Sequence, residues 1–150
     1  MLAVGATAPD FTLPDQDGRP LSLAELLKDG PLLLYFYPAD FTPVCTREAC
    51  SFAALEPDLE RTGVRLAGVS PQGGESHQRF RQRYGLKFTL LSDPERRVIR
   101  AYGCDGLLGL RVKRVTYLIG QDRRILERAH AAFRVGPHLA LAQQASSGKP

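Results

Sequence analysis

The stretch "PLLLYFYPADFTPVC", residues 31 to 45, decides the fold because it joins two elements of different kinds. Its first part, Pro31 to Pro38, is a continuous apolar run bounded by prolines, which is typical of a strand buried on both faces of a sheet. Thr42 and Pro43 suit the N-cap and the first turn of a helix, and apolar residues continue at helical spacing to about Arg61. The stretch therefore predicts a buried strand that leads directly into a long helix.

Strands and helices alternate through the rest of the chain. Further strands are expected at residues 64–70, 88–93, 113–119 and 123–130, and further helices at residues 73–85, 94–103 and from about 137. Ser76 or a nearby polar residue is expected to start the first of these helices, and Gly85 to end it. The last two strands flank the turn "GQDR" and predict an antiparallel hairpin. The alternation predicts an α/β fold with a mixed central sheet flanked by helices.

The two ends of the chain complete this outline. "LPDQDGRPLSL", residues 13–23, has Asp-Gly turn chemistry between short apolar runs and predicts an N-terminal β-hairpin before the main fold. At 150 residues the chain has the length of a single domain, which we expect to span residues 1–150. Its last part, about 140–150, is expected to be a frayed tail.

Charge and hydropathy argue against nucleic acid and membranes as partners. The net charge is +4, but arginines are spread along the chain and cluster only at 79–83 and 96–100, where helices would present them as solvated faces. We therefore expect no nucleic-acid partner. No run approaches the roughly 18 apolar residues of a membrane span, and the N-terminus lacks the pattern of a secretory signal. A soluble, cytoplasmic protein is expected, in a compartment where thiols stay reduced.

Cys45 and Cys50 are two of the three cysteines in the chain, and four residues lie between them. A metal site is not expected, because the chain has only three cysteines and three isolated histidines without ligand spacing. A permanent disulfide conflicts with helix geometry, because five residues along a helix separate the Cα atoms by about 8.7 Å. A disulfide requires them within about 7 Å. If the two cysteines ever join, at least one turn of the helix must unwind.

A reactive pair has a clear mechanism. Cys45 lies in the first turn of the expected helix, where unpaired N–H groups and the helix dipole favour a thiolate. An exposed thiolate without a neighbouring base, but with a second thiol nearby, fits oxidation chemistry better than acyl transfer. Oxidation gives a sulfenic acid, and Cys50 can condense with it to a disulfide and so prevent over-oxidation. The two cysteines are thus expected to act in sequence.

These residues resemble those of the peroxiredoxins. Pro38, Thr42 and Cys45 in "PADFTPVC" match the Pro-x3-Thr-x2-Cys signature of that family. "CTREACSF", residues 45–52, is similar to the bacterioferritin comigratory protein (peroxiredoxin Q) branch, in which the resolving cysteine often lies five residues after the peroxidatic one. Downstream segments, including "KRVTYLI", also look like that branch, so the similarity covers most of residues 3–130.

The resemblance implies a thioredoxin-like fold and an activity. It implies an atypical 2-Cys peroxidase that reduces hydrogen peroxide and organic hydroperoxides and is recycled by thioredoxin or a similar dithiol. It implies no cofactor, and a monomer, with a weak dimer as the alternative.

The resemblance also assigns roles to individual residues. Cys45 attacks the peroxide, Thr42 hydrogen-bonds the thiolate and the peroxide, and Pro38 shields the site from water. Arg114 supplies positive charge, with Arg111 as the alternative, and Glu48 orients the arginine.

Other interpretations remain open at this point. A thioredoxin-like disulfide oxidoreductase or a peroxide sensor could use the same cysteine pair, although the Cys-x2-Cys motif of the former is absent. Cys104 is interpreted as an ordinary small residue after a helix, with a second resolving thiol as the alternative. His77 is interpreted as a polar residue at a helix start.

Overall fold

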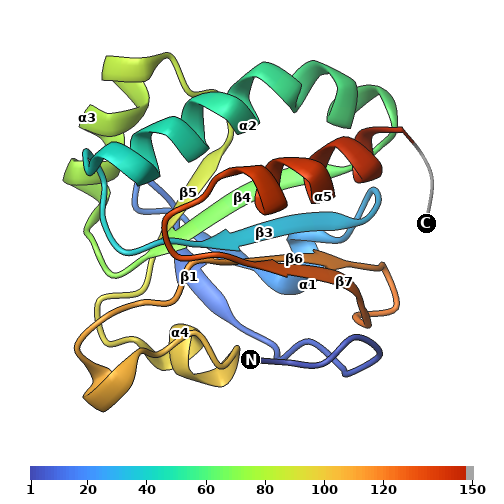
Figure 1. The fold of residues 1–150 in the computed structure, drawn as a ribbon, viewed down its shortest axis with the longest axis horizontal. Helices are drawn as coiled ribbons and strands as arrows, with labels where there is room; N and C mark the ends of the chain where they lie inside the picture. The colour runs from blue at the N-terminus through green and yellow to red at the C-terminus, as the bar shows by residue number, and fades with distance from the viewer. Residues whose placement is uncertain (148–150) are drawn as a thin grey trace.

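The computed structural model describes residues 1–147 and is built around a five-stranded mixed sheet (Figure 1). The strand order is β5-β4-β3-β6-β7. These strands are β3 (Leu32–Phe36), β4 (Arg65–Ser70), β5 (Thr89–Ser92), β6 (Val115–Ile119) and β7 (Ile125–His130). Strands β3, β4 and β5 run parallel, while β6 is antiparallel to both β3 and β7. The mixed sheet predicted from the sequence is confirmed.

The central strand β3 explains why its sequence is a continuous apolar run. It pairs with a strand on each side, and every one of its residues is buried. Because successive side chains of a strand point to opposite faces, Leu33 and Tyr35 enter one hydrophobic core and Leu34 and Phe36 enter the other. A strand covered on both faces has no polar position to alternate with.

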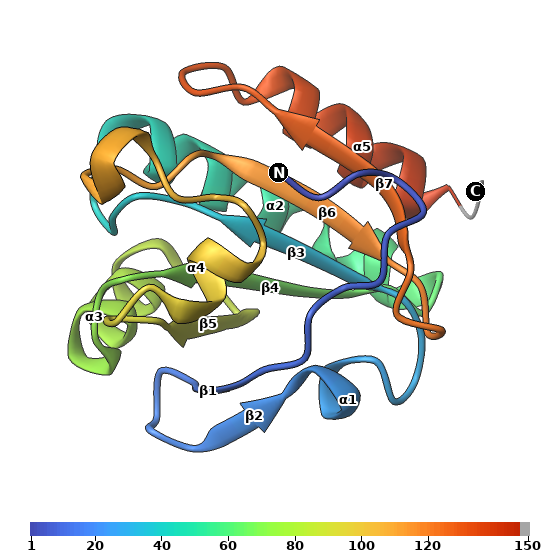
Figure 2. The same ribbon diagram turned by 90° about the horizontal axis from the view of Figure 1, so that it is seen from below.

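Helices cover the two faces of the sheet unequally. One face carries α2 (Pro43–Arg61), α3 (Gly74–Tyr84) and α5 (Gly136–Ser146), as Figure 1 shows. The other face carries short helices α1 (Leu23–Leu26) and α4 (Arg97–Ala101) with the N-terminal segment (Figure 2). The N-terminal segment includes the predicted hairpin, which forms a separate two-stranded sheet from β1 (Thr12–Pro14) and β2 (Pro20–Ser22).

Helices α3 and α4 have bounds that differ from the sequence predictions. Helix α3 begins earlier, because Gly73 rather than Ser76 is its N-cap. Helix α4 covers only residues 97–101, because Arg96 has a left-handed backbone conformation and cannot continue a helix from Pro94. Gly85 ends α3 in the left-handed conformation, as predicted.

The frayed tail expected from about residue 140 differs most from the structure. Helix α5 continues to Ser146, and Leu141, Ala142 and Ala145 are buried in the core beside α2. Their spacing places them on one face of the helix, so burial of that face holds the segment in place. The last three residues of the expected tail, 148–150, lie outside the described residues. Between residues 1 and 147 no helix is long and apolar enough to cross a bilayer.

Candidate active site

Cys45 lies in the first turn of α2, where this helix begins above the end of β3. Thr42 is the N-cap residue and Pro43 occupies the first helical position, as predicted. The Thr42 side chain does not cap the helix, however, because its hydroxyl donates instead to the Ala39 carbonyl oxygen at 3.2 Å. The thiol was expected to be exposed, but only 1% of Cys45 is accessible to solvent.

Arg114, just before β6, points its guanidinium group at the thiol. Its Nη2 atom donates to Cys45 Sγ at 3.1 Å, and its Nη1 atom donates to Glu48 Oε1 at 2.8 Å. The third contact, from Nε to the Ala132 carbonyl oxygen at 3.0 Å, fixes the plane of the group. A buried guanidinium group is thus in direct contact with the sulfur atom.

Glu48 is the charge partner that holds Arg114 in this orientation. It lies three residues after Cys45, so both side chains project from the same face of α2 toward the sheet. Burial raises the pKa of Glu48 to about 7, although the charge and hydrogen bond of Arg114 act in the opposite direction. Its Oε2 atom is buried without a hydrogen bond. Glu48 therefore titrates near neutral pH, and the charge around the thiol changes with it.

His138 on α5 completes the buried cluster, and it was not among the predicted site residues. Its Nδ1 atom lies 3.6 Å from Glu48 Oε2 and 2.8 Å from the Thr116 hydroxyl. Burial lowers the pKa of His138 to about 4, so the ring is neutral at neutral pH. Its Nε2 atom donates to the Ala131 carbonyl oxygen at 3.0 Å, which leaves Nδ1 to accept from Thr116.

A sequence signal for His138 existed. His138, Leu141, Ala142 and Ala145 follow the helical i, i+3, i+4, i+7 spacing, which places the histidine on the apolar face of α5. The pattern shows that the residue is buried. It does not show what the imidazole contacts, because β6 and α2 reach it only through the tertiary fold.

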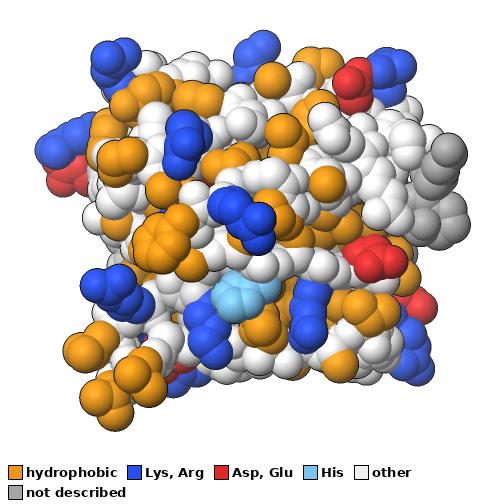
Figure 3. All heavy atoms as spheres, in the orientation of Figure 1, with side chains coloured by type: hydrophobic (Ala, Val, Ile, Leu, Met, Phe, Trp, Pro, Cys, Tyr) orange, Lys and Arg blue, Asp and Glu red, His pale blue; other side chains and the backbone are white. Residues whose placement is uncertain are grey.

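A cavity of about 590 Å³ opens over the cysteine loop. Pro38, Thr42 and Arg114 line it, together with Arg111 and the exposed Phe133. Leu107 and Leu110 lie on the same rim, where hydrophobic side chains protrude over the η1 segment (Leu107–Gly109) at the lower left of Figure 3. The cavity thus combines a largely apolar wall with cationic groups beside the thiol.

The geometry separates the two arginine candidates. Arg114 is buried and touches both Cys45 and Glu48. Arg111 is exposed and contributes only to the cavity rim.

The other two cysteines occupy different environments. Cys50 is exposed on α2, which is continuous from residue 43 to 61 with Cys45 and Cys50 both as free thiols. Cys104 is buried on the opposite face of the sheet, in the core formed with Phe36 and Tyr117. Burial raises the pKa of the Cys104 thiol to about 12, so this group stays protonated. Among residues 1–147, no three His, Cys, Asp or Glu side chains are placed to hold a metal ion.

The fold and the cysteine site together define the protein class. The sequence profile of the AhpC/TSA family matches residues 4–128, and the chain belongs to this family. It is 39% identical over 145 residues to a putative peroxiredoxin bcp of Coxiella burnetii, which covers 93% of this chain and 95% of that protein. It is 42% identical over 119 residues to the chloroplastic peroxiredoxin Q of Sedum lineare.

Solved structures agree with this placement. The peroxidoxin BcpB of Mycobacterium tuberculosis superposes with a TM-score of 0.91 at 36% identity, covering 98% of this chain and 97% of that one. Peroxiredoxin Q of Xanthomonas campestris gives 0.84 at 27% identity, covering 98% and 96%. The thioredoxin-like fold implied by the sequence resemblance is confirmed. The chain spans 63% of the Sedum relative and 54% of two rice relatives, although it covers nearly all of the bacterial one.

Proposed function

We propose that the chain is a thiol-dependent peroxidase of the atypical 2-Cys type that reduces hydrogen peroxide and organic hydroperoxides. The observation that carries the proposal is the 3.1 Å contact between Cys45 Sγ and Nη2 of Arg114, an arginine that also lines the cavity. A fixed cation next to the sulfur stabilises the attacking thiolate. It also remains charged while negative charge develops on the departing oxygen.

The proposed reaction has three steps. The Cys45 thiolate attacks the terminal peroxide oxygen, the O–O bond breaks, and the departing oxygen takes a proton to leave as an alcohol or water. Cys45 is then a sulfenic acid, which condenses with the Cys50 thiol to a disulfide and releases water. An external dithiol, which we propose to be thioredoxin, reduces the disulfide and regenerates both thiols.

The remaining site residues have supporting roles in this proposal. Thr42 is placed on the cavity wall, where its hydroxyl can donate to a bound peroxide after leaving the Ala39 carbonyl. Pro38, half-buried on the same wall, limits the access of water to the sulfur. Glu48 holds Arg114 in place.

The cavity supports organic hydroperoxides as substrates. Hydrogen peroxide needs little more room than two water molecules, whereas about 590 Å³ with an apolar wall can hold an organic substituent. The related protein of Xanthomonas campestris has been described in terms of alkyl peroxide reduction. We extend that substrate class to this chain as part of the proposal.

The proposal also covers partners and location. A reducing compartment such as the cytoplasm would keep Cys50 available and supply the dithiol reductant. A monomer is the proposed working state, with a weak dimer through the "PADFT" loop as the alternative, and nucleic acid and membranes are not proposed as partners.

The test is peroxide-dependent oxidation of NADPH in the presence of thioredoxin and thioredoxin reductase. We expect turnover with hydrogen peroxide and with cumene hydroperoxide. Cys50→Ser is expected to undergo the first oxidation at the normal rate, to stall in recycling through thioredoxin, and to accumulate sulfinic acid at Cys45 by mass spectrometry. The matched control Ser51→Ala, one residue further on the same helix, should recycle normally.

Two outcomes would contradict the proposal. Slow stoichiometric oxidation of Cys45 without turnover would favour a peroxide sensor. Normal recycling of Cys50→Ser through thioredoxin would move the resolving role to another thiol.

A further inference from the structure

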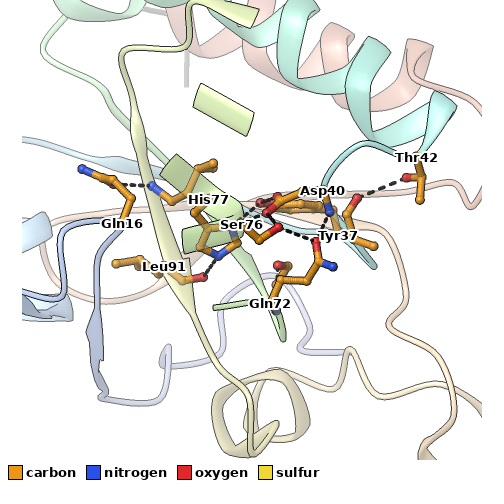
Figure 4. A network of polar contacts seen from close by, with 11 residues as sticks. Gln16, Tyr37, Asp40, Thr42, Gln72, Ser76, His77 and Leu91 are labelled. Carbon is orange, nitrogen blue, oxygen red and sulfur yellow. Dashed lines mark hydrogen bonds and ion pairs between the residues drawn. The ribbon is translucent and has the colours of Figure 1, made fainter. Parts of the chain in front are cut away.

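A second buried polar cluster lies beside the loop that joins β3 to α2 (Figure 4). Asp40 is at its centre: the Tyr37 hydroxyl donates to Oδ1 at 2.6 Å, and the Ser76 hydroxyl donates to Oδ2 at 2.7 Å. His77 Nδ1 lies 2.7 Å from the same Oδ2, and the Asp40 N–H donates to Gln72 Oε1. We call these five residues the Asp40 cluster. The side chains of Asp40 and His77 are fully buried, and neither has a role in the proposed reaction.

His77 and Asp40 bind each other, and each is held by further contacts. His77 Nε2 lies 3.1 Å from the Leu91 carbonyl oxygen, which can only accept, so Nε2 donates to it. Burial raises the pKa of Asp40, but the hydrogen bond and charge of His77 and the two hydroxyl donors outweigh it, so the pKa is lowered overall. The two residues form a buried hydrogen-bonded pair. The sequence predicted only a polar residue at a helix start for His77, and the structure adds a buried partner to that position near the start of α3.

The same loop is also held through the next residue, Phe41. Its backbone has φ +67°, a left-handed conformation that is strained for a bulky side chain. The Phe41 ring packs against Phe80 and Tyr84, with ring centroids 5.1 and 6.2 Å away. Because Ser76, His77, Phe80 and Tyr84 all belong to α3, this helix holds a strained loop in place from outside the active site.

The loop is continuous with the reactive site. Asp40 lies between Pro38 and Thr42, which both line the cavity, and five residues before Cys45. The loop also precedes the turn of α2 that must unwind before Cys50 can reach Cys45, since both lie on an intact helix in this structure. Contacts that bind the loop to α3 favour the intact helix over the unwound one. Removing one partner of the buried pair would leave the other without its hydrogen bond and weaken that preference.

We propose that Asp40 and His77 are positioning residues that hold the 38–42 loop and the first turn of α2 in the peroxide-reactive arrangement. By doing so they limit how often that turn opens for disulfide formation. This inference rests on the proposed peroxidase function. It assigns to α3 a control over the balance between attack on peroxide and resolution by Cys50. Tight anchoring favours fast attack, and it also lengthens the time in which the sulfenic acid can react with a second peroxide.

The test compares Asp40→Asn with Tyr102→Phe. Asp40→Asn keeps the shape of the side chain and removes its charge. The control removes one hydroxyl that donates to the Pro9 carbonyl oxygen at 2.7 Å, on the other face of the sheet and away from the loop. In the reduced protein, amide hydrogen exchange of residues 46–50, the first hydrogen-bonded amides of α2, should be about tenfold faster in Asp40→Asn, or roughly 1.4 kcal/mol in the opening equilibrium. The same amides should be unchanged in Tyr102→Phe.

The rate constants of oxidation and of disulfide formation should change in opposite directions. In Asp40→Asn we expect the second-order rate constant for oxidation of Cys45 by peroxide to fall. The first-order rate constant of disulfide formation should rise, and less sulfinic acid should form per turnover at a given peroxide concentration. A general loss of stability would not raise one rate while lowering the other. If Asp40→Asn does not fold, Ser76→Ala removes a single donor to the same carboxylate and should shift the same quantities in the same directions.

Equal exchange of residues 46–50 in Asp40→Asn and in the wild type would overturn the inference, and so would equal changes in Asp40→Asn and Tyr102→Phe. Failure of the proposed function is a separate result. A wild-type protein that does not turn over peroxide refutes the peroxidase, while the exchange measurement still decides whether the Asp40 cluster holds the helix.

Discussion

Cys45 and Cys104 are almost equally buried, yet their surroundings differ in one decisive respect. Cys45 has a guanidinium nitrogen 3.1 Å from its sulfur. Cys104 has no cation in that position: its sulfur lies 3.5 Å from the Tyr102 carbonyl oxygen, to which it donates, and burial raises the pKa of its thiol to about 12. Burial alone disfavours the charged form of a thiol, so the contact with a buried cation is what distinguishes the proposed nucleophile Cys45 from the structural Cys104.

The sheet keeps the two environments apart. Cys45 packs with Leu33 and Tyr35 under α2, whereas Cys104 packs with Phe36 and Tyr117 on the other face. The alternating side chains of β3 thus contribute to both cores, and the backbone of the sheet lies between the two sulfurs. Cys104 would need much more than the unwinding of one helical turn to reach Cys45.

The largest difference between the two cysteines is expected when the sulfur atom of each is replaced by oxygen. Cys45→Ser should reduce peroxide turnover to the uncatalysed background, because a hydroxyl is not ionised at neutral pH and cannot form a sulfenic acid. Cys104→Ser should leave turnover within about twofold of the wild type and cost on the order of 1 kcal/mol of stability through the buried hydroxyl. The coupled NADPH assay and urea denaturation measure the two quantities. Loss of recycling in Cys104→Ser would give this thiol a resolving role and contradict the comparison.

A smaller effect is expected when the cation is removed and the sulfur is kept. Arg114→Gln should slow oxidation of Cys45 by peroxide by roughly 10²–10³-fold, since it removes a preorganised charged donor at the reacting atoms. Arg111→Gln is the matched control, because it deletes an equal charge from the exposed rim of the same cavity. That variant should change the rate by only about two- to threefold, through weak screened electrostatics. Stopped-flow measurement of thiol oxidation distinguishes them, and equal losses would show that overall positive charge matters rather than contact with sulfur.

Local sequence patterns predicted the frame of this site well. The apolar run of β3, the Thr-Pro start of α2 and the five-residue offset of Cys50 are signals contained within about twenty neighbouring residues. They predicted the strand and the helix, which depend on local geometry and are confirmed, while the need for unwinding stays a prediction. The choice between Arg111 and Arg114 could not be made in this way, because β6 must first pair with β3 before either side chain has a position.

The two buried histidines show where sequence reasoning ended. His77 and His138 contact elements that are distant in the chain, Asp40 in one case and Thr116 with Glu48 in the other. A histidine on a helix has the same local signature whether it is solvated or paired, and only packing of the layers decides. The segment after residue 140 was misjudged for a related reason, because its stability comes from burial against α2 rather than from its own composition.

The smallest expected effect concerns stability. It is the contribution that Glu48 and His138, the titratable groups near Cys45, make to the free energy of unfolding. The pKa of Glu48 is raised to about 7 from an ordinary 4.5 by burial, so between these values the folded protein binds more protons than the unfolded one. Its contribution is fully present below pH 4.5 and is lost as pH rises through 7. The pKa of His138 is lowered to about 4 from 6.5 by burial, which reverses the sign. Stability from His138 is lost as pH falls from 6.5 through 4.

In the wild type, the titrations of Glu48 and His138 change the free energy of unfolding in opposite directions between pH 4.5 and 6.5. Glu48→Gln should leave the His138 slope, so that the free energy of unfolding rises with pH, relative to the wild type, by up to roughly 1.4 kcal/mol per unit. His138→Gln should leave only the pH dependence due to Glu48. Its free energy of unfolding should therefore fall with pH, relative to the wild type, by a similar amount. Urea denaturation at half-unit steps measures both, and the differences from the wild type cancel the other titrating groups. A Glu48→Gln curve parallel to the wild type would mean that Arg114 fully compensates the burial of this carboxylate, and that the cluster holds its cation beside the sulfur without a pH-dependent cost.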